Sequence, residues 1–285
     1  MQLLVQPDDG IGPVLAAIRN ARRSIDLHIF KLDSREIEKA LADAVKRGVG
    51  VRTLIAHTHG RKDKALRKLE LQLLKIGATV SRSGNDLLRY HGKILIVDRK
   101  KLYVLAYNLT RNDIGHCRSL GIATRRRDPV DEASKVFDAD FDRKEYSGNS
   151  PGLIVSPVNA RERLSAFLRK ARKELLIYGS VTDRACIRIL QERVKAGVVV
   201  RIIGRVAKRQ EGLRAERYAG DRMHLRALVR DGRAAFVGSQ ILRKAELDAR
   251  REIGVIVKQA QVVRQIAEVF AADWAQTEAS RMEAA

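Results

Sequence analysis

An internal repeat is the feature that most constrains the fold of this chain. Residues 3–33, LLVQPDDGIGPVLAAIRNARRSIDLHIFKLD, align with residues 153–183, LIVSPVNARERLSAFLRKARKELLIYGSVTD, at a constant shift of 150. Farther along, residues 91–98 align with residues 224–231 at a shift of 133, so the second copy is shorter before that segment. Because a repeat decides the architecture, we expect two related halves of about 140 residues each.

The fold class follows from the pattern inside each half. In the first, SIDLHIF and VRTLIA have the apolar runs of strands, and they flank SREIEKALADAVKRG, an amphipathic helix that ends at Gly48. A strand, helix, strand unit implies a right-handed crossover. The sequence therefore predicts an α/β protein in which two similar, mainly parallel mixed sheets, flanked by helices, face each other across a pseudo-twofold axis. The connector EYSGNSPG divides the chain into predicted domains at 1–146 and 147–285.

Charge is the unusual part of the composition. Apolar residues make up 45% of the chain, which indicates a folded protein, while 56 Lys and Arg against 34 Asp and Glu give a net charge of +22. Such an excess attracts polyanions, whether nucleic acid, an anionic membrane surface or a phosphorylated substrate. A basic, solvated surface without a specific partner is the alternative interpretation.

Other compositional features exclude several classes of protein. Two cysteines, Cys117 and Cys186, provide neither a disulfide framework nor zinc spacing. The amino terminus lacks a basic n-region, and no run of about 20 apolar residues could span a bilayer. We therefore expect a soluble, cytoplasmic protein without a transmembrane segment.

Both halves carry a histidine and a cation at the same spacing. The segments are HGKILIVD at 91–98 and HLRALVRD at 224–231. Residues i and i+2 of a strand face the same side, so His91 lies beside Lys93 and His224 beside Arg226. A twofold arrangement could bring all four to one cleft. One imidazole could then attack phosphorus while the other protonates the leaving oxygen and the cations neutralise the phosphate, without any metal or other cofactor.

At these residues the sequence resembles the phospholipase D superfamily, whose signature is His, one residue, Lys, four residues and Asp. The resemblance extends from Leu3 to about Val257, and a paired occurrence of the motif is specific. It implies a phosphodiesterase that forms a phosphohistidine intermediate. Phospholipases, transphosphatidylases, cardiolipin and phosphatidylserine synthases and metal-independent nucleases all belong to this superfamily, so the resemblance predicts the chemistry better than the substrate.

The resemblance also extends the predicted site, with departures from the family pattern. Motif aspartates Asp98 and Asp231 are included, although we expect them to hold backbone or Lys/Arg partners more than substrate. Downstream, the family has Gly, Ser, any residue and Asn. Here the first copy, LAYN, keeps only Asn108, while the second, GSQI, keeps Gly and Ser239. Arg226 replaces the usual Lys and retains the positive charge.

A carboxylate usually orients each histidine of this family from 25 to 30 residues downstream. Glu252 suits that role for His224, whereas Ser119 occupies the equivalent position in the first copy. This leaves His91 without an evident carboxylate partner. His91 is the favoured nucleophile because its copy has the complete His, Lys and Asp set, and the reverse assignment to His224 stays open.

Basic segments favour one substrate class. The stretches RKDKALRKLE at 61–70 and RVAKRQEGLRAERYAGDR at 205–222 occupy corresponding connections, which border the cleft in the family. A long polyanion benefits from many such cations, so nucleic acid is the preferred substrate and partner of a chain that we expect to act as a monomer. Phospholipid is the alternative substrate, and a catalytically impaired nucleic-acid-binding protein is the second alternative. The predicted substrate-binding residues are Arg61, Lys62, Lys64, Arg205, Lys208 and Arg209.

Overall fold

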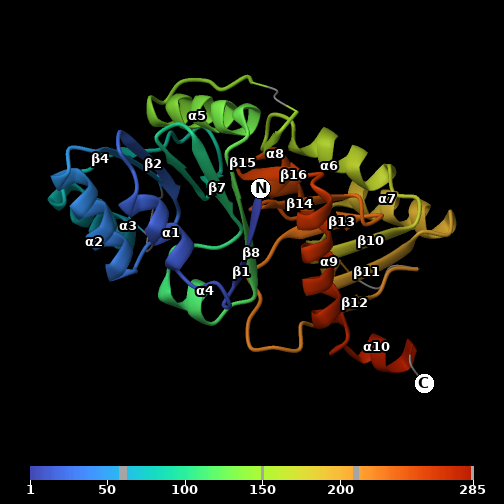
Figure 1. Cartoon of the computed structure of the whole chain (residues 1–285). Coiled ribbons are helices and arrows are strands. Elements are labelled where there is room, and N and C mark those ends of the chain that lie inside the picture. Colours follow the sequence, from blue (N-terminus) through green and yellow to red (C-terminus); the bar gives the residue numbers. More distant parts are fainter. Residues whose placement is uncertain (58–62, 149–150, 208–211, 284–285) are drawn as a thin grey trace.

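The computed structural model describes residues 1–57, 63–148, 151–207 and 212–283. Within these ranges the chain forms two seven-stranded sheets and a two-stranded sheet that joins them (Figure 1). The elements up to residue 141 are β1 (Gln2–Gln6), α1 (Gly12–Arg19), β2 (Ser24–Ile29), α2 (Arg35–Lys46), β3 (Gly50–Ile55), α3 (Asp63–Lys75), β4 (Thr79–Arg82), β5 (Arg89–Tyr90), β6 (Ile94–Val97), β7 (Lys101–Leu105), α4 (Arg111–Gly115), β8 (Ser119–Thr124) and α5 (Arg127–Phe141). Those that follow are β9 (Leu153–Val155), α6 (Ala160–Arg169), β10 (Glu174–Val181), α7 (Arg184–Lys195), β11 (Val199–Val206), β12 (Ala215–Glu216), β13 (Ala227–Arg230), β14 (Ala234–Gly238), α8 (Lys244–Asp248), β15 (Arg250–Arg251), β16 (Ile253–Val257), α9 (Ala260–Trp274) and α10 (Glu278–Glu283).

The two large sheets are mixed. Their strand orders match when written from the first strand of each half: β1-β8-β7-β6-β2-β3-β4 and β9-β16-β14-β13-β10-β11-β12. Among the described strands of each sheet, two neighbouring pairs are parallel and four are antiparallel. Mixed sheets flanked by helices are confirmed, but parallel pairing is the minority. Tight turns at Asp98–Lys100 and Asp231–Arg233 account for one antiparallel pair in each sheet, because each folds the next strand back on the one before it.

Local sequence explains the helix that joins β2 to β3. Ser34 caps α2 by accepting a hydrogen bond from the backbone N–H of Ile37, and Ile37, Leu41 and Ala44 are buried. Gly48 follows the helix with φ of +82°, a conformation that glycine adopts without strain. The predicted helix and its two flanking strands are therefore confirmed.

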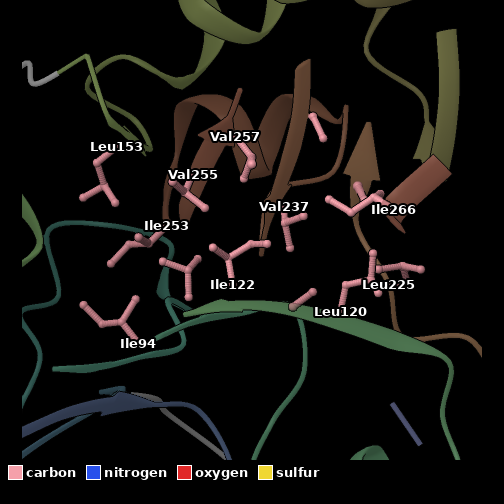
Figure 2. Packing of buried hydrophobic residues seen from close by; sticks show 14 of the residues in the cluster. Ile94, Leu120, Ile122, Leu153, Leu225, Val237, Ile253, Val255, Val257 and Ile266 are labelled. Carbon is pink, nitrogen blue, oxygen red and sulfur yellow. The ribbon is translucent and has the colours of Figure 1, made fainter. Parts of the chain in front are cut away.

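Helices cover the outer face of each large sheet. One buried cluster joins α1, α2 and α3 to the first sheet, and another joins α6 and α7 to the second. The inner faces pack against each other in a third cluster, to which α5 and α9 also contribute. Figure 2 shows Ile94 and Ile122 of one sheet beside Val237 and Val255 of the other, all fully buried. Burial of each such side chain stabilises the fold by about 1.5–3 kcal/mol, so the contact between halves is a true hydrophobic core.

Contacts between the halves occur in reciprocal pairs. Helix α5 packs against β9 of the second half, and α9 packs against β1 of the first. Tyr90 pairs in parallel with Arg251, and Met223 forms the same kind of bridge with Arg118. At the shift of 133, Tyr90 corresponds to Met223 and Arg118 corresponds to Arg251, so the two pairs are the same contact with the halves exchanged. Such an exchange is expected of a pseudo-twofold axis. No helix in the described ranges is both long and apolar enough to cross a bilayer.

Candidate active site

The motif histidines lie just before β6 and β13, where the two halves meet. The backbone N–H of His91 donates to the carbonyl oxygen of Arg251 at 2.7 Å, and that of His224 donates to the carbonyl oxygen of Arg118 at 3.1 Å. The sequence suggested that both histidines lie within strands. Instead, each is held by an extended segment of the opposite half, so one seam positions both imidazoles.

A buried carboxylate orients the imidazole of His91. Its Nδ1 lies 3.0 and 2.9 Å from Oε1 and Oε2 of Glu252, which is fully buried. Since a carboxylate accepts a hydrogen bond from Nδ1–H, this contact selects the tautomer whose lone pair is on Nε2. Phe30 packs against the same ring edge-to-face, with centroids 4.9 Å apart, and restricts its rotation. His91 is thus prepared to act through Nε2.

A different carboxylate orients His224. Oδ2 of Asp113, in α4, lies 2.7 Å from Nδ1 of His224. The same oxygen accepts hydrogen bonds from the backbone N–H of Asn108 at 3.0 Å and from its side-chain amide at 2.8 Å. Asn108 therefore positions Asp113, which in turn positions His224, and both histidines have a carboxylate on Nδ1.

This arrangement corrects two expectations from the sequence. Glu252 orients His91 and not His224, and His91 does have a carboxylate partner. The physical reason is the reciprocal seam: Glu252 directly follows Arg251, whose backbone pairs with the first half. A downstream carboxylate therefore reaches the histidine of the other copy.

Asp113 is the functional residue that sequence reasoning missed. The shift of 133 relates it to Glu246, a buried carboxylate that accepts a hydrogen bond from Arg250 at 2.7 Å. Comparing acidic positions in the two copies could therefore have indicated it. Ser119, the counterpart of Glu252, does lie at the opposite histidine, where its hydroxyl donates to the carbonyl oxygen of His224 at 2.6 Å. The hydroxyl is too short to reach the ring, and Asp113 acts there instead.

Two cations complete the site. Nζ of Lys93 lies 3.1 Å from Nε2 of His91 and donates to the carbonyl oxygen of His91 at 2.9 Å. Nη1 of Arg226 donates to the carbonyl oxygen of Ala106 in the opposite half at 3.2 Å. Burial lowers the pKa of Lys93 to about 7, although Glu252 opposes this shift. Burial likewise raises the pKa of Glu252 to about 7 against the effect of Lys93, so both groups can change charge near neutral pH.

The two histidines and the two cations lie close enough together to shift one another's pKa values. Burial lowers the pKa of both histidines, and the charges of Lys93 and Arg226 lower both further. His224 also contributes to lowering the pKa of His91. At His224 the hydrogen bond with Asp113 opposes the shift. His91 is therefore held neutral; the pKa of His224 is lowered as well, but there Asp113 opposes the effect of burial.

An open pocket of about 330 Å³ lies beside His224, and Arg205, Arg217, Tyr218 and Arg226 are among its lining residues. This cationic lining suits a phosphate. Among the residues that the structure describes, no three His, Cys, Asp or Glu side chains converge as metal ligands. Of the predicted substrate-binding residues, Arg205 reaches this pocket, whereas Lys64 lies on an outer surface of α3. The others, Arg61, Lys62, Lys208 and Arg209, lie outside the described residues.

Ser239 contacts the segment that carries Glu252. Its hydroxyl oxygen accepts a hydrogen bond from the backbone N–H of Ile253 at 3.0 Å, and its own N–H donates to the carbonyl oxygen of Ile253. Burial dominates the pKa of Glu252, but the Ser239 hydroxyl acts in the opposite direction. Ser239 is therefore placed to act through the orienting carboxylate.

The motif aspartates have a structural role. Oδ1 of Asp98 accepts hydrogen bonds from the backbone N–H groups of Arg22, Arg23 and Ser24 at 2.6 to 3.1 Å. Asp231 binds three N–H groups in the equivalent loop of the second half. Both carboxylates lie at the ends of β6 and β13 that are remote from the histidines. Their predicted backbone partners are thus confirmed.

We expect Asp98→Ala to lower stability without changing turnover. The substitution leaves three N–H groups without their charged acceptor and places alanine at φ of +53°, so the free energy of unfolding should fall by about 2–4 kcal/mol. Denaturant unfolding would measure this, with Asp131→Ala, which removes only an exposed pair with Arg127, as the control. A hundredfold loss of turnover in the folded Asp98 variant would contradict a purely structural role.

Comparison with known proteins places the chain among related sequences. A family model described as "Cardiolipin synthase, PLD-like domain" matches residues 14–143 and 164–274, which is most of both halves. A phospholipase D from Rickettsia bellii is 33% identical over 93 residues, or 33% of this chain. That match spans 44% of the relative, so less than half of its length is covered.

Solved structures share the fold at low sequence identity. A polyphosphate kinase from Porphyromonas gingivalis superimposes with a TM-score of 0.79 at 17% identity, covering 96% of this chain and 50% of the kinase. A phosphatidylserine synthase from Haemophilus influenzae superimposes with a TM-score of 0.72 at 11% identity, covering 96% of this chain and 85% of the synthase. These likenesses support the two-sheet architecture over nearly the whole chain.

Proposed function

Since the chain belongs to the phospholipase D superfamily of phosphodiesterases, we propose that it cleaves phosphodiesters of nucleic acid through a phosphohistidine intermediate and without a metal ion. The observation that carries this proposal is the pair of histidines with a carboxylate on each Nδ1, at 2.9 Å for His91 and 2.7 Å for His224. Two oriented imidazoles with Lys93 and Arg226 supply a nucleophile, a proton donor and charge neutralisation.

In the first proposed step, Nε2 of His91 attacks phosphorus. A P–N bond forms, the P–O bond to the leaving group breaks, and Nε2–H of His224 gives its proton to the leaving oxygen. Lys93 and Arg226 neutralise the non-bridging oxygens as charge develops on them. In the second step, His224 takes a proton from water, the water oxygen attacks phosphorus, and the P–N bond breaks to restore His91.

The electrostatics favour His91 as the nucleophile. A nucleophilic imidazole has to be neutral, and burial, Lys93 and Arg226 all lower the pKa of His91. The acid has to hold a proton, and Asp113 counteracts the lowering of the pKa of His224. Asp113 can do this because it stays ionised. Burial would raise the pKa of Asp113, but the hydrogen bonds from His224 and Asn108 outweigh burial and hold that pKa well below its usual range.

Charge around the pocket supports nucleic acid as the substrate. Arg205 and Arg217 line the pocket beyond the reacting groups, where a polymer can place further phosphates and a single headgroup cannot. The strongly exposed apolar side chains Leu71 and Leu74 lie on α3, away from this lining. A nucleic-acid strand therefore uses more of the described pocket than a lipid does.

Phospholipid is the second candidate substrate. It is favoured by the description of the matching family model, which refers to cardiolipin synthase, and by Leu88, which is 67% exposed next to β5 of the seam. An apolar side chain near the site could contact an acyl chain.

One experiment separates these candidates. Single-stranded DNA, RNA and phosphatidylcholine vesicles are incubated with the protein in EDTA, and the products of each are quantified. We expect cleavage of a nucleic acid and an unchanged rate when EDTA is omitted. Cleavage of phosphatidylcholine alone would favour the lipid assignment, and affinity for nucleic acid without cleavage of any substrate would identify a binding protein.

The pH dependence of activity should report the deprotonation of the buried Lys93. Glu252 becomes ionised and Lys93 loses its charge as the pH rises through about 7, so activity should peak near neutrality in a narrow bell. With bis(p-nitrophenyl) phosphate, whose leaving group needs no acid, the alkaline fall should report Lys93. In Lys93→Arg this fall should move to higher pH, because a guanidinium stays protonated. An unchanged alkaline fall in this variant would contradict the assignment.

A further inference from the structure

Cations gather at the strand ends that face away from the histidines. Strands β6, β8, β13 and β16 each begin near a site residue. At the other end of each strand the chain has basic residues: RKK at 99–101 after β6, RRR at 125–127 after β8, RDGR at 230–233 at the end of β13, and Lys258 after β16. Strands of four to six residues are roughly 13–20 Å long, so this basic face is separate from the catalytic pocket.

Two adjoining grooves form this face, which we call the rear cationic surface. The larger one has a volume of about 1080 Å³, and its lining includes Arg22, Lys100 and Arg125. The smaller one, of about 330 Å³, is lined in part by Arg126 and Lys258. Arg125 and Arg126 are neighbours in the chain and face different grooves. The two grooves therefore adjoin at the loop between β8 and α5, one on either side of it.

Eleven Lys and Arg residues line the two grooves, against four carboxylates: Asp98, Asp128, Asp131 and Glu162. Asp98 is occupied by three backbone N–H groups, and Asp131 pairs with Arg127 at 3.2 Å. Over the described ranges of the chain, several lining cations make no ion pair with a carboxylate: Arg22, Lys100, Arg125, Arg126, Lys170 and Lys258. Gathered like charges repel one another and destabilise the compact chain, a cost that an anionic ligand removes.

We propose that the rear cationic surface binds the phosphate backbone of a nucleic acid, separately from the catalytic pocket. A nucleic acid repeats its phosphates along a line and can occupy both grooves, and each contact releases counterions. A flat bilayer cannot enter a groove, and the strongly exposed apolar residues of the described chain, which interfacial binding requires, do not line either one. This proposal does not depend on which phosphodiester the histidines attack.

The test compares two triple variants with the same net charge. Lys100→Gln/Arg125→Gln/Lys258→Gln removes three cations of the rear cationic surface, and Lys39→Gln/Lys46→Gln/Arg264→Gln removes three exposed cations on α2 and α9. Both are made with His91→Ala so that the probe stays intact. Fluorescence anisotropy of a fluorescein-labelled DNA duplex then measures affinity against salt concentration.

We expect the rear variant to bind at least tenfold more weakly at low salt, with a slope of log K against log[salt] that is smaller by about 2.7, since each lost phosphate contact removes about 0.9. The control variant should retain the parent slope. Equal losses in both variants would overturn the proposal, because they would reflect net charge alone. Unchanged duplex affinity with weaker binding to phosphatidylglycerol vesicles would overturn it in favour of a membrane. Turnover of bis(p-nitrophenyl) phosphate by the triple variants with His91 restored reports the catalytic site independently.

Discussion

His224→Ala should release one p-nitrophenolate per chain from bis(p-nitrophenyl) phosphate and then stop. Its leaving group departs without a proton donor, so His91 can still attack. Hydrolysis of the phosphohistidine requires His224 as a base, and the covalent intermediate should accumulate. His91→Ala should give neither burst nor adduct, and steady-state turnover should fall by about 10⁴-fold or more in both variants.

Stopped-flow absorbance measures the burst, and mass spectrometry locates an acid-labile phosphoryl adduct on residue 91. His116→Ala, which removes an exposed imidazole at the end of α4, is the control and should keep wild-type turnover. An adduct on His224 in the His91 variant would reverse the two roles. Full turnover by either variant would exclude the two-histidine mechanism.

The second large effect should come from the carboxylates. Glu252→Gln and Asp113→Asn keep the shape of each side chain, but an amide can hold the imidazole in the wrong tautomer, and a loss of about 10³–10⁴ in kcat is expected. Glu252→Gln should slow the burst itself, because Nε2 of His91 would then carry a proton. Asp113→Asn should slow the first step with an unactivated phosphodiester far more than it slows the p-nitrophenolate burst, since only the former needs an acid in that step, while hydrolysis of the phosphohistidine should be slowed with both substrates.

Asp183→Asn is the matched control. This carboxylate is also buried and ion-paired, but its partners are Arg161 and the first turn of α7 and not a histidine. Its loss should reduce stability and leave the burst rate within about tenfold. If Glu252→Gln and Asp183→Asn had the same effect on the burst, the orienting role of Glu252 would be wrong.

Local signals predicted the elements of the fold better than their pairing. The α2 helix was evident because its apolar residues recur every four positions and the glycine that ends it follows directly. The hairpin between β6 and β7 was not, because its turn residues Asp98 and Arg99 adopt positive φ without the glycine that usually signals such a turn. The sheets were therefore expected to be mainly parallel, and they are mostly antiparallel.

The sequence by itself determined the repeat, the two halves and the four groups His91, Lys93, His224 and Arg226, because the spacing of each motif recurs in both copies and does not depend on how the halves pack. Only the tertiary structure decided that Glu252 serves His91 and that Asp113 serves His224. Those contacts join residues 161 and 111 positions apart across a seam between the halves. Spacing along one copy carries no information about which face of the other copy it meets, and the pseudo-twofold packing alone supplies it.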